Sequence, residues 1–507
     1  MRALLAALLF CLASTLQAQS IPFSPYTPVQ PNRTPLAESA EVPFALLLGL
    51  DGATPLFVNP ARAARSKNRF VYGTVHPVGA PNAVSFAALL GTRRSRWLVV
   101  AENVIYTQDY TSSDLTNQEF DRGDIISLRN VDRTNRRTIQ NLGTRGRLLR
   151  VGRTDFGGYA FGLFAGYGRE SLVYESDAEY ISRDLRTEPN SNVFEVEEQN
   201  FTEDETTGIA YGLGAEFALA GQKWDLAAAA SYQGSEVLRT AEHSFLNVSE
   251  SETTVSPTEI YTRLTEREMA SEARTDASPQ GFGLDLVGTL QAGASRDDYL
   301  FTAASGAMLS GTGTYLLDYF ERQFSRVDDN GSVTEDVVVD EREAAGEDDV
   351  TMRVLRLSLG YIYARKGRGA QVLAGVVPTA GFARVESLDA SQIDVRRIYT
   401  DVTVLGLQLP LHVHLPVKRS LALFGGGVYS YEHFEVEQAA ESIPLDDAGD
   451  LIVIDQQRVD NTTTFVSGGR LYGGAILSLR SGLTAQAAFR GDLANFEQWT
   501  VSLGYRF

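Results

Sequence analysis

Two histidines, His412 and His414, lie two positions apart in a run where apolar and polar residues alternate. In an extended chain, side chains two positions apart point to the same side, so the two imidazoles share a face and could together bind a metal ion. Such an ion would need further ligands from neighbouring strands. The alternative, which we favour, is that both histidines are polar residues facing a wet interior, with no metal and no other cofactor bound.

The same alternation places many other polar side chains on one face of successive runs. Their charges are mixed, so they can pair across a narrow interior and fill it, or they can line an aqueous path. We predict that they line the lumen of a closed sheet. These residues are Glu216, Asp225, Asp285, Gln291, Arg356, Gln408, His412, His414, Arg480, Gln486, Arg490 and Arg506.

A cluster of carboxylates in residues 319–349 is a further candidate site. Carboxylate oxygens can hold divalent cations, but the stretch lacks the fixed spacing and the glycine of a dedicated calcium loop. We therefore predict a solvated outer loop. Its acidic residues are Glu335, Asp336, Asp340, Glu341, Glu343, Glu347, Asp348 and Asp349.

Motifs for catalysis are not found in the sequence. It contains no glycine-rich phosphate loop, no serine-nucleophile elbow, no HExxH helix and no convincing pair of a serine or aspartate with a histidine. The only cysteine, Cys11, lies in the first 18 residues, so the remaining chain has no disulfide and no catalytic thiol. We predict that the protein is not an enzyme.

The elements that must position the polar face are β-strands. From Trp499 to Phe507 the odd positions are Trp, Val, Leu, Tyr and Phe, and the even positions are Thr, Ser, Gly and Arg. Alternation with period two gives a strand one apolar and one polar face. The second face is small or charged in run after run, as a wall between lipid and a wet lumen requires. Similar runs occupy residues 159–168, 209–219, 355–364, 405–415 and 483–490.

Short turn-like links alternate with long polar stretches along the chain. This pattern is typical of transmembrane antiparallel up-and-down β-barrels, which have tight periplasmic turns and long outer loops. We count sixteen strands in residues 69–507, or fourteen if the first two are discounted. Trp97 and Trp224 each follow a short turn closely, where an interfacial aromatic girdle belongs. The long stretches are residues 110–141, 177–205, 239–277, 319–349, 387–395 and 433–461.

The chain before residue 69 has two parts. Residues 1–18 carry one positive charge, an apolar core and a small residue at the end, which predicts a secretory signal peptide. Residues 19–68 begin as a proline-rich extended leader and end in a short apolar segment, 44–66. In that segment Thr54-Pro55 and Asn59-Pro60 each place a capping side chain before a proline at the first helical position. We predict a small plug or periplasmic cap.

The net charge of the chain indicates which kinds of binding partner are disfavoured. The formal net charge is −19 at pH 7, and few of the basic residues are lysines. An acidic, lysine-poor chain argues against binding to nucleic acid or other polyanions.

Two short segments carry a resemblance to known proteins. The stretch GATPLFVNPARAA, residues 52–64, resembles the N-terminal region of the long-chain fatty-acid transporter family of outer-membrane barrels, and is similar to related barrels of secretion systems. The resemblance implies that Asn59, Pro60 and Ala61 belong to a hatch inside the barrel, and that hydrophobic substrates pass through. Tyr505 and Phe507 resemble the signal that the barrel-assembly machinery recognises.

Together these observations predict a protein of the cell outer membrane, in contact with outer-membrane lipid. We expect passive transport of small molecules, hydrophobic ones included. A receptor with a full plug domain is disfavoured because only about fifty residues lie between the signal peptide and the barrel. The alternative is a barrel that transports nothing and serves as a platform for secretion or surface attachment.

Overall fold

Alternating residues build a wall of antiparallel strands in the structure, a computed structural model. It describes residues 59–507 apart from 66–68, 79–81, 93–94, 116–117, 122–124, 131, 156, 187–191, 257–258, 293–297, 330–331, 367–369, 391–394, 444–456 and 493–497. The predicted signal peptide and most of the predicted leader therefore lie outside the described residues. Within these, the helical element is the 3-10 helix η1 (Pro60–Arg65). No described helix has the length and apolar character needed to cross a membrane.

Nineteen strands form one sheet. They are β1 (Phe70–Val78), β2 (Asn82–Gly91), β3 (Arg96–Leu115), β4 (Gln118–Asp121), β5 (Ile125–Asn130), β6 (Asp132–Gly152), β7 (Gly158–Arg186), β8 (Asn192–Ala220), β9 (Trp224–Ser256), β10 (Glu259–Ala277), β11 (Gln280–Ala292), β12 (Asp298–Asp329), β13 (Ser332–Lys366), β14 (Gln371–Ala390), β15 (Val395–Lys418), β16 (Leu421–Ile443), β17 (Gln457–Ser478), β18 (Leu483–Asp492) and β19 (Gln498–Arg506).

The sheet closes on itself. Consecutive strands of the wall pair antiparallel, with β3 paired to β6, and β1 also pairs with β19, in a register that sets Phe70 opposite Arg506. Strands β10 and β11 are two halves of one strand, because both pair with β9 and only Ser278 and Pro279 lie between them. Strands β4 and β5 form a hairpin, and β5 pairs antiparallel with the upper part of β7. The wall therefore has sixteen strands among the described residues, which confirms the predicted barrel fold.

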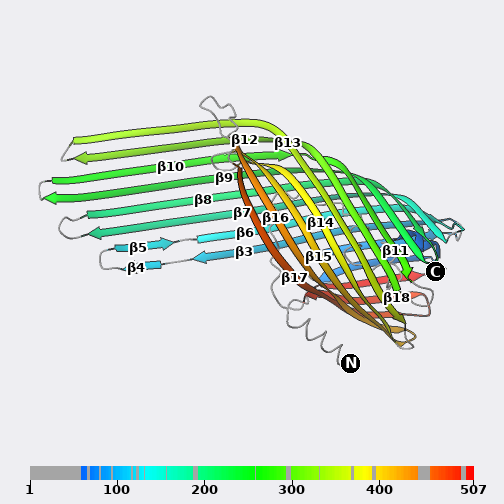
Figure 1. The fold of residues 1–507 in the computed structure, drawn as a ribbon. Coiled ribbons are helices and arrows are strands. Elements are labelled where there is room, and N and C mark those ends of the chain that lie inside the picture. The colour runs from blue at the N-terminus through cyan, green and yellow to red at the C-terminus, as the bar shows by residue number, and fades with distance from the viewer. Residues whose placement is uncertain are drawn as a thin grey trace.

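The two ends of the barrel differ. At one end the strands meet in tight turns, closed for example by hydrogen bonds from Thr92 N to Ser95 O (2.9 Å) and from Gly157 N to Thr154 O (3.1 Å). Gly157 has a φ of +134°, a conformation that side chains with a Cβ rarely adopt. At the other end, strands from β3 to β13 run on well past the ends of β14 to β17, so one side of the barrel is taller (Figure 1).

The tall side replaces the predicted outer loops. Residues 177–205, 239–277 and 319–349 are paired strands over their described parts, so the loop prediction is wrong there. The physical reason is that apolar and β-branched residues recur between the charges. Glu335 lies opposite Arg326, and Glu341 lies opposite Phe320, so cross-strand pairs stabilise a sheet that is polar in composition.

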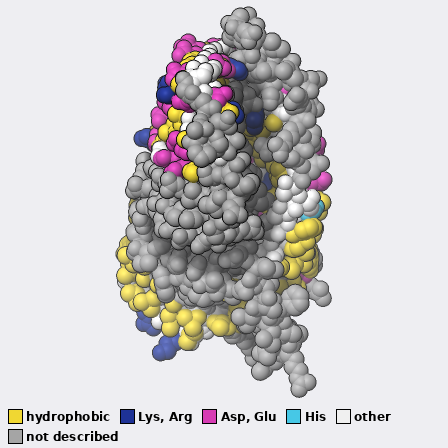
Figure 2. Space-filling view, turned by 90° about the vertical axis from the view of Figure 1, so that its left-hand side faces the viewer, with side chains coloured by type: hydrophobic (Ala, Val, Ile, Leu, Met, Phe, Trp, Pro, Cys, Tyr) yellow, Lys and Arg dark blue, Asp and Glu magenta, His cyan; other side chains and the backbone are white. Residues whose placement is uncertain are grey.

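The two faces of the wall differ in the closed part of the barrel. Large apolar side chains on the outer face are open to the surroundings, as for Phe282 (72% exposed) and Leu359 (64%). Side chains on the inner face are buried, and Ala218, Ile362 and Val377 are all 0% exposed. Yellow hydrophobic side chains gather in the lower part of the view, whereas magenta acidic side chains gather near the top (Figure 2).

Candidate functional site

The helix η1 lies against the inner wall at the end with the tight turns. Its N-terminus is capped by Asn59, whose Oδ1 accepts a hydrogen bond from Ala61 N (3.0 Å), with proline at the first helical position. The Asn59 amide Nδ2 also donates to the carbonyl oxygens of Leu219 (3.0 Å) and Leu226 (3.4 Å) on two adjacent strands. The structure thus places Asn59, Pro60 and Ala61 in contact with the wall, and all three are buried.

Two arginines of η1 hold it to the turn between β8 and β9. Arg62 Nε donates to Asp225 Oδ2 (2.7 Å), and its Nη2 forms an ion pair with the same oxygen. Arg65 Nη2 donates to the carbonyl oxygen of Gly221. Asp225, one of the residues predicted to line the lumen, therefore serves as an anchor for η1.

Arg96 of β3 and Arg153, in the turn after β6, bind the other end of η1. Arg96 Nη1 donates to Ala63 O (3.2 Å), and Arg153 Nε donates to Ala64 O (3.3 Å). The last carbonyls of a short helix have no intrahelical partner, so these guanidinium groups satisfy them. The helix η1 also packs closely against Gly158, where an added Cβ would lie 2.7 Å from Ala61 O.

A buried ion pair lies farther along the inner wall. Arg147 on β6 reaches across β7 to Glu216 on β8, with Nε 3.0 Å from Oε2 and Nη2 2.6 Å from Oε2. Gly162 is the β7 residue directly opposite Glu216. Both charged side chains are 2% exposed. The pair joins three strands on the inner surface and satisfies the Glu216 carboxylate.

Polar and aromatic side chains also meet on the short side of the barrel. His412 is fully buried, and its Nδ1 lies 2.9 Å from the Tyr472 hydroxyl on β17. Its ring is stacked on those of Tyr472 and Phe424. The buried atoms His412 Nε2, Gln408 Oε1 and Thr379 Oγ1 have no hydrogen-bond partner among the described residues. Buried polar atoms without partners are unfavourable, so these atoms lower the stability of this part of the wall.

The other predicted lumen residues are placed as follows. Asp285 is buried on β11, and Arg356 on β13 lies 3.6 Å from Glu432 on β16. His414, Gln291 and Gln486 are partly buried at inward positions, and Arg506 is at an inward position but exposed near the end of β19. Arg490 pairs in register with Tyr472, and its side chain lies outside the described part of the chain.

Arg480 does not line the lumen, which corrects the prediction. Strand β17 ends at Ser478, and Arg480 lies exposed in the turn before β18, closed by a hydrogen bond from Gly482 N to Leu479 O (3.1 Å). Alternation of residues between two faces holds only within a strand. Beyond Ser478 an even or odd position therefore no longer tells which way a side chain points.

The acidic stretch of 319–349 is part of a long hairpin. Its residues pair between β12 and β13 throughout the described positions. On the inner face, the Tyr319 hydroxyl donates to Glu321 Oε2 (2.5 Å), and Arg267 Nε donates to Glu321 Oε1 (2.8 Å). Burial, and then the bond to Glu321, raises the pKa of Tyr319 to about 12, and the hydrogen bond from Tyr319 lowers the pKa of Glu321. No group of three or more His, Cys, Asp or Glu residues is arranged to hold a metal ion within the described ranges.

Several residues of this site were not predicted. Arg62, Arg96 and Arg147 each make a contact described above, as does Tyr472. The signal for Arg147 was available, because it alternates with Leu148 and lies on the polar face of its strand. The partners themselves depend on strand register, which the sequence does not state.

Comparisons with known proteins give distant structural similarities. No family model matches the chain, and no curated protein matches it. Among solved structures, the chain is similar to the toluene transporter TodX of Pseudomonas putida, with 11% identity over 90% of this chain and 92% of that chain and a TM-score of 0.27. It is also similar to a mutant form of the ferric enterobactin receptor PfeA of Pseudomonas aeruginosa, with 11% identity over 87% and 80% of the two chains and a TM-score of 0.26. TM-scores this low establish neither a shared family nor a shared function.

Proposed function

We propose that the protein is a barrel of the outer membrane that passively transports small molecules, hydrophobic ones included. The observation that carries the proposal is the position of η1, which is held inside a closed wall by side-chain contacts. A short segment seated in this way can restrict a pathway and can be displaced without breaking the wall.

The outer face supports a membrane location. Large apolar side chains such as Phe282, Leu284 and Leu359 are exposed around the closed part of the barrel, and a water-soluble monomer rarely exposes so much apolar surface. A closed barrel also satisfies its backbone hydrogen bonds within the wall, which is required in hydrocarbon. Trp97 and Trp224 are exposed at the end with tight turns, where a girdle would meet the lipid headgroups.

The inner face supports a pathway of mixed character. Polar atoms such as His412 Nε2 and Gln408 Oε1 lie on this face, and so do the buried apolar side chains of Phe301 and Leu373. A small hydrophobic molecule could move along the apolar part while ions are disfavoured there. The resemblance of Asn59, Pro60 and Ala61 to the hatch motif of fatty-acid transporters agrees with such a substrate.

Assembly in the membrane would involve the last strand. Tyr505 and Phe507 are exposed on the outer face with ring centroids 6.1 Å apart, and Arg69 lies 5.2 Å from the centre of the Phe507 ring. We propose that the barrel-assembly machinery recognises these two rings.

The test is transport by purified protein in planar bilayers and liposomes. Deleting residues 44–66, or replacing Asp225 with asparagine, should raise solute flux because both changes release η1. Arg326→Ala is the matched control, since it removes an exposed ion pair with Glu335 (3.8 Å) outside the closed barrel, and it should leave flux unchanged. No flux in the wild type and in both releasing variants would overturn the proposal.

A second candidate function is an interaction platform that transports nothing. The tall side of the barrel favours it, because that wall rises above the closed part without enclosing a path. An absence of flux together with specific binding of a protein to the tall side would establish it.

A further inference from the structure

Within the described part of the chain, the upper part of β13 is a free sheet edge. Every residue from Ser332 to Thr351 pairs with β12, but pairing with β14 begins only at Thr351, opposite Glu386. No described strand pairs with the second edge of residues 332–350. In Figure 1 this part of β13 runs along the border of the tall side. An edge of this kind presents a row of backbone donors and acceptors to any chain that lies beside it.

The side chains along this edge are acidic and apolar. On the outer face, Val337 and Val339 are followed by carboxylates, and Val338 on the other face is 56% exposed. The outward carboxylates form no ion pair with a described residue. They are Glu341, Glu343, Glu347 and Asp349.

Two inward acids of β13, Asp340 and Asp348, are already compensated. Arg342 Nε donates to Asp340 Oδ1 (3.0 Å), and Arg397 Nε donates to Asp348 Oδ2 (2.6 Å). Uncompensated charge therefore concentrates on one face of the free edge. A ligand for this edge should carry its positive charges at every second position, because that spacing matches the outer face of a strand.

We propose that this edge binds an extended, basic segment of another protein. The segment would add as a further strand beside residues 332–350, with lysine or arginine opposite the outward carboxylates and small apolar residues beside the valines. Backbone hydrogen bonds would supply affinity, and the alternating charges would set the register. This binding is independent of transport through the lumen.

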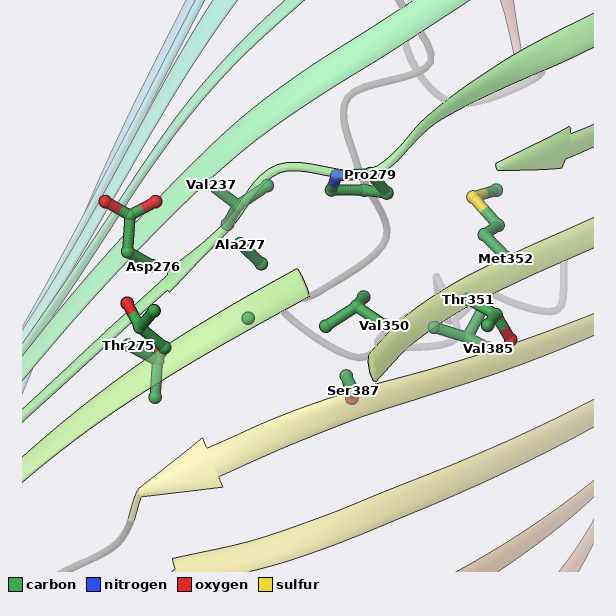
Figure 3. Close-up of a pocket in the computed structure, with 12 residues that line it drawn as sticks. Val237, Thr275, Asp276, Ala277, Pro279, Val350, Thr351, Met352, Val385 and Ser387 are labelled. Carbon is green, nitrogen blue, oxygen red and sulfur yellow. The ribbon is translucent and has the colours of Figure 1, made fainter. Parts of the chain in front are cut away.

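A small cavity marks the lower end of the binding edge. It has a volume of about 30 Å³ and lies where β13 separates from β14, between Val350 and Met352 on one strand and Val385 and Ser387 on the other. Figure 3 shows these side chains with Val237 and Pro279 around it. Its lining is largely apolar, so the added segment should end there in a small apolar side chain.

Other occupants fit the edge less well. A second copy of this acidic chain would set like charges opposite one another, which destabilises a strand pair. A cation lacks a prepared group of three ligands among the described residues. Anionic lipid headgroups would be repelled by the outward carboxylates.

The experiment measures peptide binding to the folded full-length protein in detergent by fluorescence anisotropy. The probes are a labelled ten-residue peptide of alternating lysine and valine, the same peptide with glutamate for lysine, and the lysine peptide with two central prolines. The lysine peptide should bind, and the other two should bind at least about tenfold more weakly. Equal binding of the proline peptide would overturn strand addition, since proline cannot donate to the ladder.

Two double variants locate the site. Glu341→Lys with Glu343→Lys should weaken binding about tenfold, because two favourable cross-strand pairs become repulsive. The matched control is Glu242→Lys with Glu272→Lys, which makes the same charge change at facing residues of β9 and β10 away from the edge. Equal weakening in both double variants would mean general attraction to an acidic surface and would overturn the assignment.

Two further outcomes would also overturn the proposal. One is loss of peptide binding in millimolar calcium at constant ionic strength, which would indicate a cation site. The other is a dimer in sedimentation that the Glu341 and Glu343 changes dissociate. Failure here would leave the transport proposal standing, because flux does not depend on this edge.

Discussion

The Arg147–Glu216 pair shows how single residues stabilise the inner wall. Both charges are removed from water, and each is satisfied by the other through more than one hydrogen bond. A charge left alone in such a place is strongly unfavourable, whereas a well-packed apolar pair of similar size is often tolerated. The geometry of the pair, and not its charge alone, decides its contribution.

We predict that Glu216→Leu alone lowers the free energy of unfolding by about 3–5 kcal/mol, because it removes the carboxylate that neutralises the buried Arg147 charge. The double change Arg147→Met with Glu216→Leu should recover most of that loss. Arg384→Ala, which breaks an exposed pair with Asp401, is the control and should change stability by less than about 1 kcal/mol. Denaturant unfolding in lipid vesicles, followed by tryptophan fluorescence, measures all three. Equal losses for the single and double changes would contradict this account.

Alternation in the sequence predicts on which side of the wall a side chain lies, within a strand. Glu216, Asp285, Gln408 and His412 are all buried on the inner face, as their positions within their strands require. Arg480 shows where this reasoning fails, because beyond the end of a strand an even or odd position no longer indicates which face a side chain takes. The partners of the inward residues could not be predicted, since they depend on which residues of neighbouring strands lie opposite one another.

At the scale of elements, the position of η1 depends on its close packing against the start of β7. Gly158 has no side chain, and η1 occupies the space where one would be. An added Cβ would lie 2.7 Å from Ala61 O and 2.7 Å from Ala64 Cβ, so η1 would have to move.

We predict that Gly158→Val displaces η1 while the barrel stays folded. The readout is labelling of Ala63→Cys by a water-soluble maleimide, in a chain whose Cys11 is replaced by serine. Ala63 is fully buried, so the thiol should be protected until Gly158 is changed. Gly146→Val is the control, because a Cβ there meets nothing within 4 Å, and it should leave the thiol protected. Protection that survives in the Gly158 variant would mean that η1 is not held by this contact.

The number of strands was predictable because tight turns and long polar stretches alternate along the chain. Their lengths were not. Hydrophobicity alone suggested that the strands end where the apolar face ends, but pairing continues into polar residues wherever charges and β-branched side chains match across the ladder. The β12–β13 hairpin is the clearest case, because its acidic residues were expected in a loop.

At the scale of the whole molecule, the exposed apolar belt should sit in lipid. With Trp499 replaced by phenylalanine, the remaining tryptophans are Trp97 and Trp224, both on the outer face at the end with tight turns. We predict that lipids brominated near the glycerol quench their fluorescence more than lipids brominated near the chain end. Leu359→Trp, placed within the belt, should show the reverse order. No quenching by either lipid would remove the membrane location.

The unequal height of the wall has a consequence for how molecules reach the barrel. From β3 to β13 the wall extends beyond the barrel opening, and from β14 to β17 it ends at a low rim. Under the proposed transport, a molecule arriving from the surroundings approaches over the low rim and meets the inner side of the tall wall first. Access to the barrel opening is therefore asymmetric. The orientation of neighbouring surface structures around the barrel should affect how readily solutes arrive.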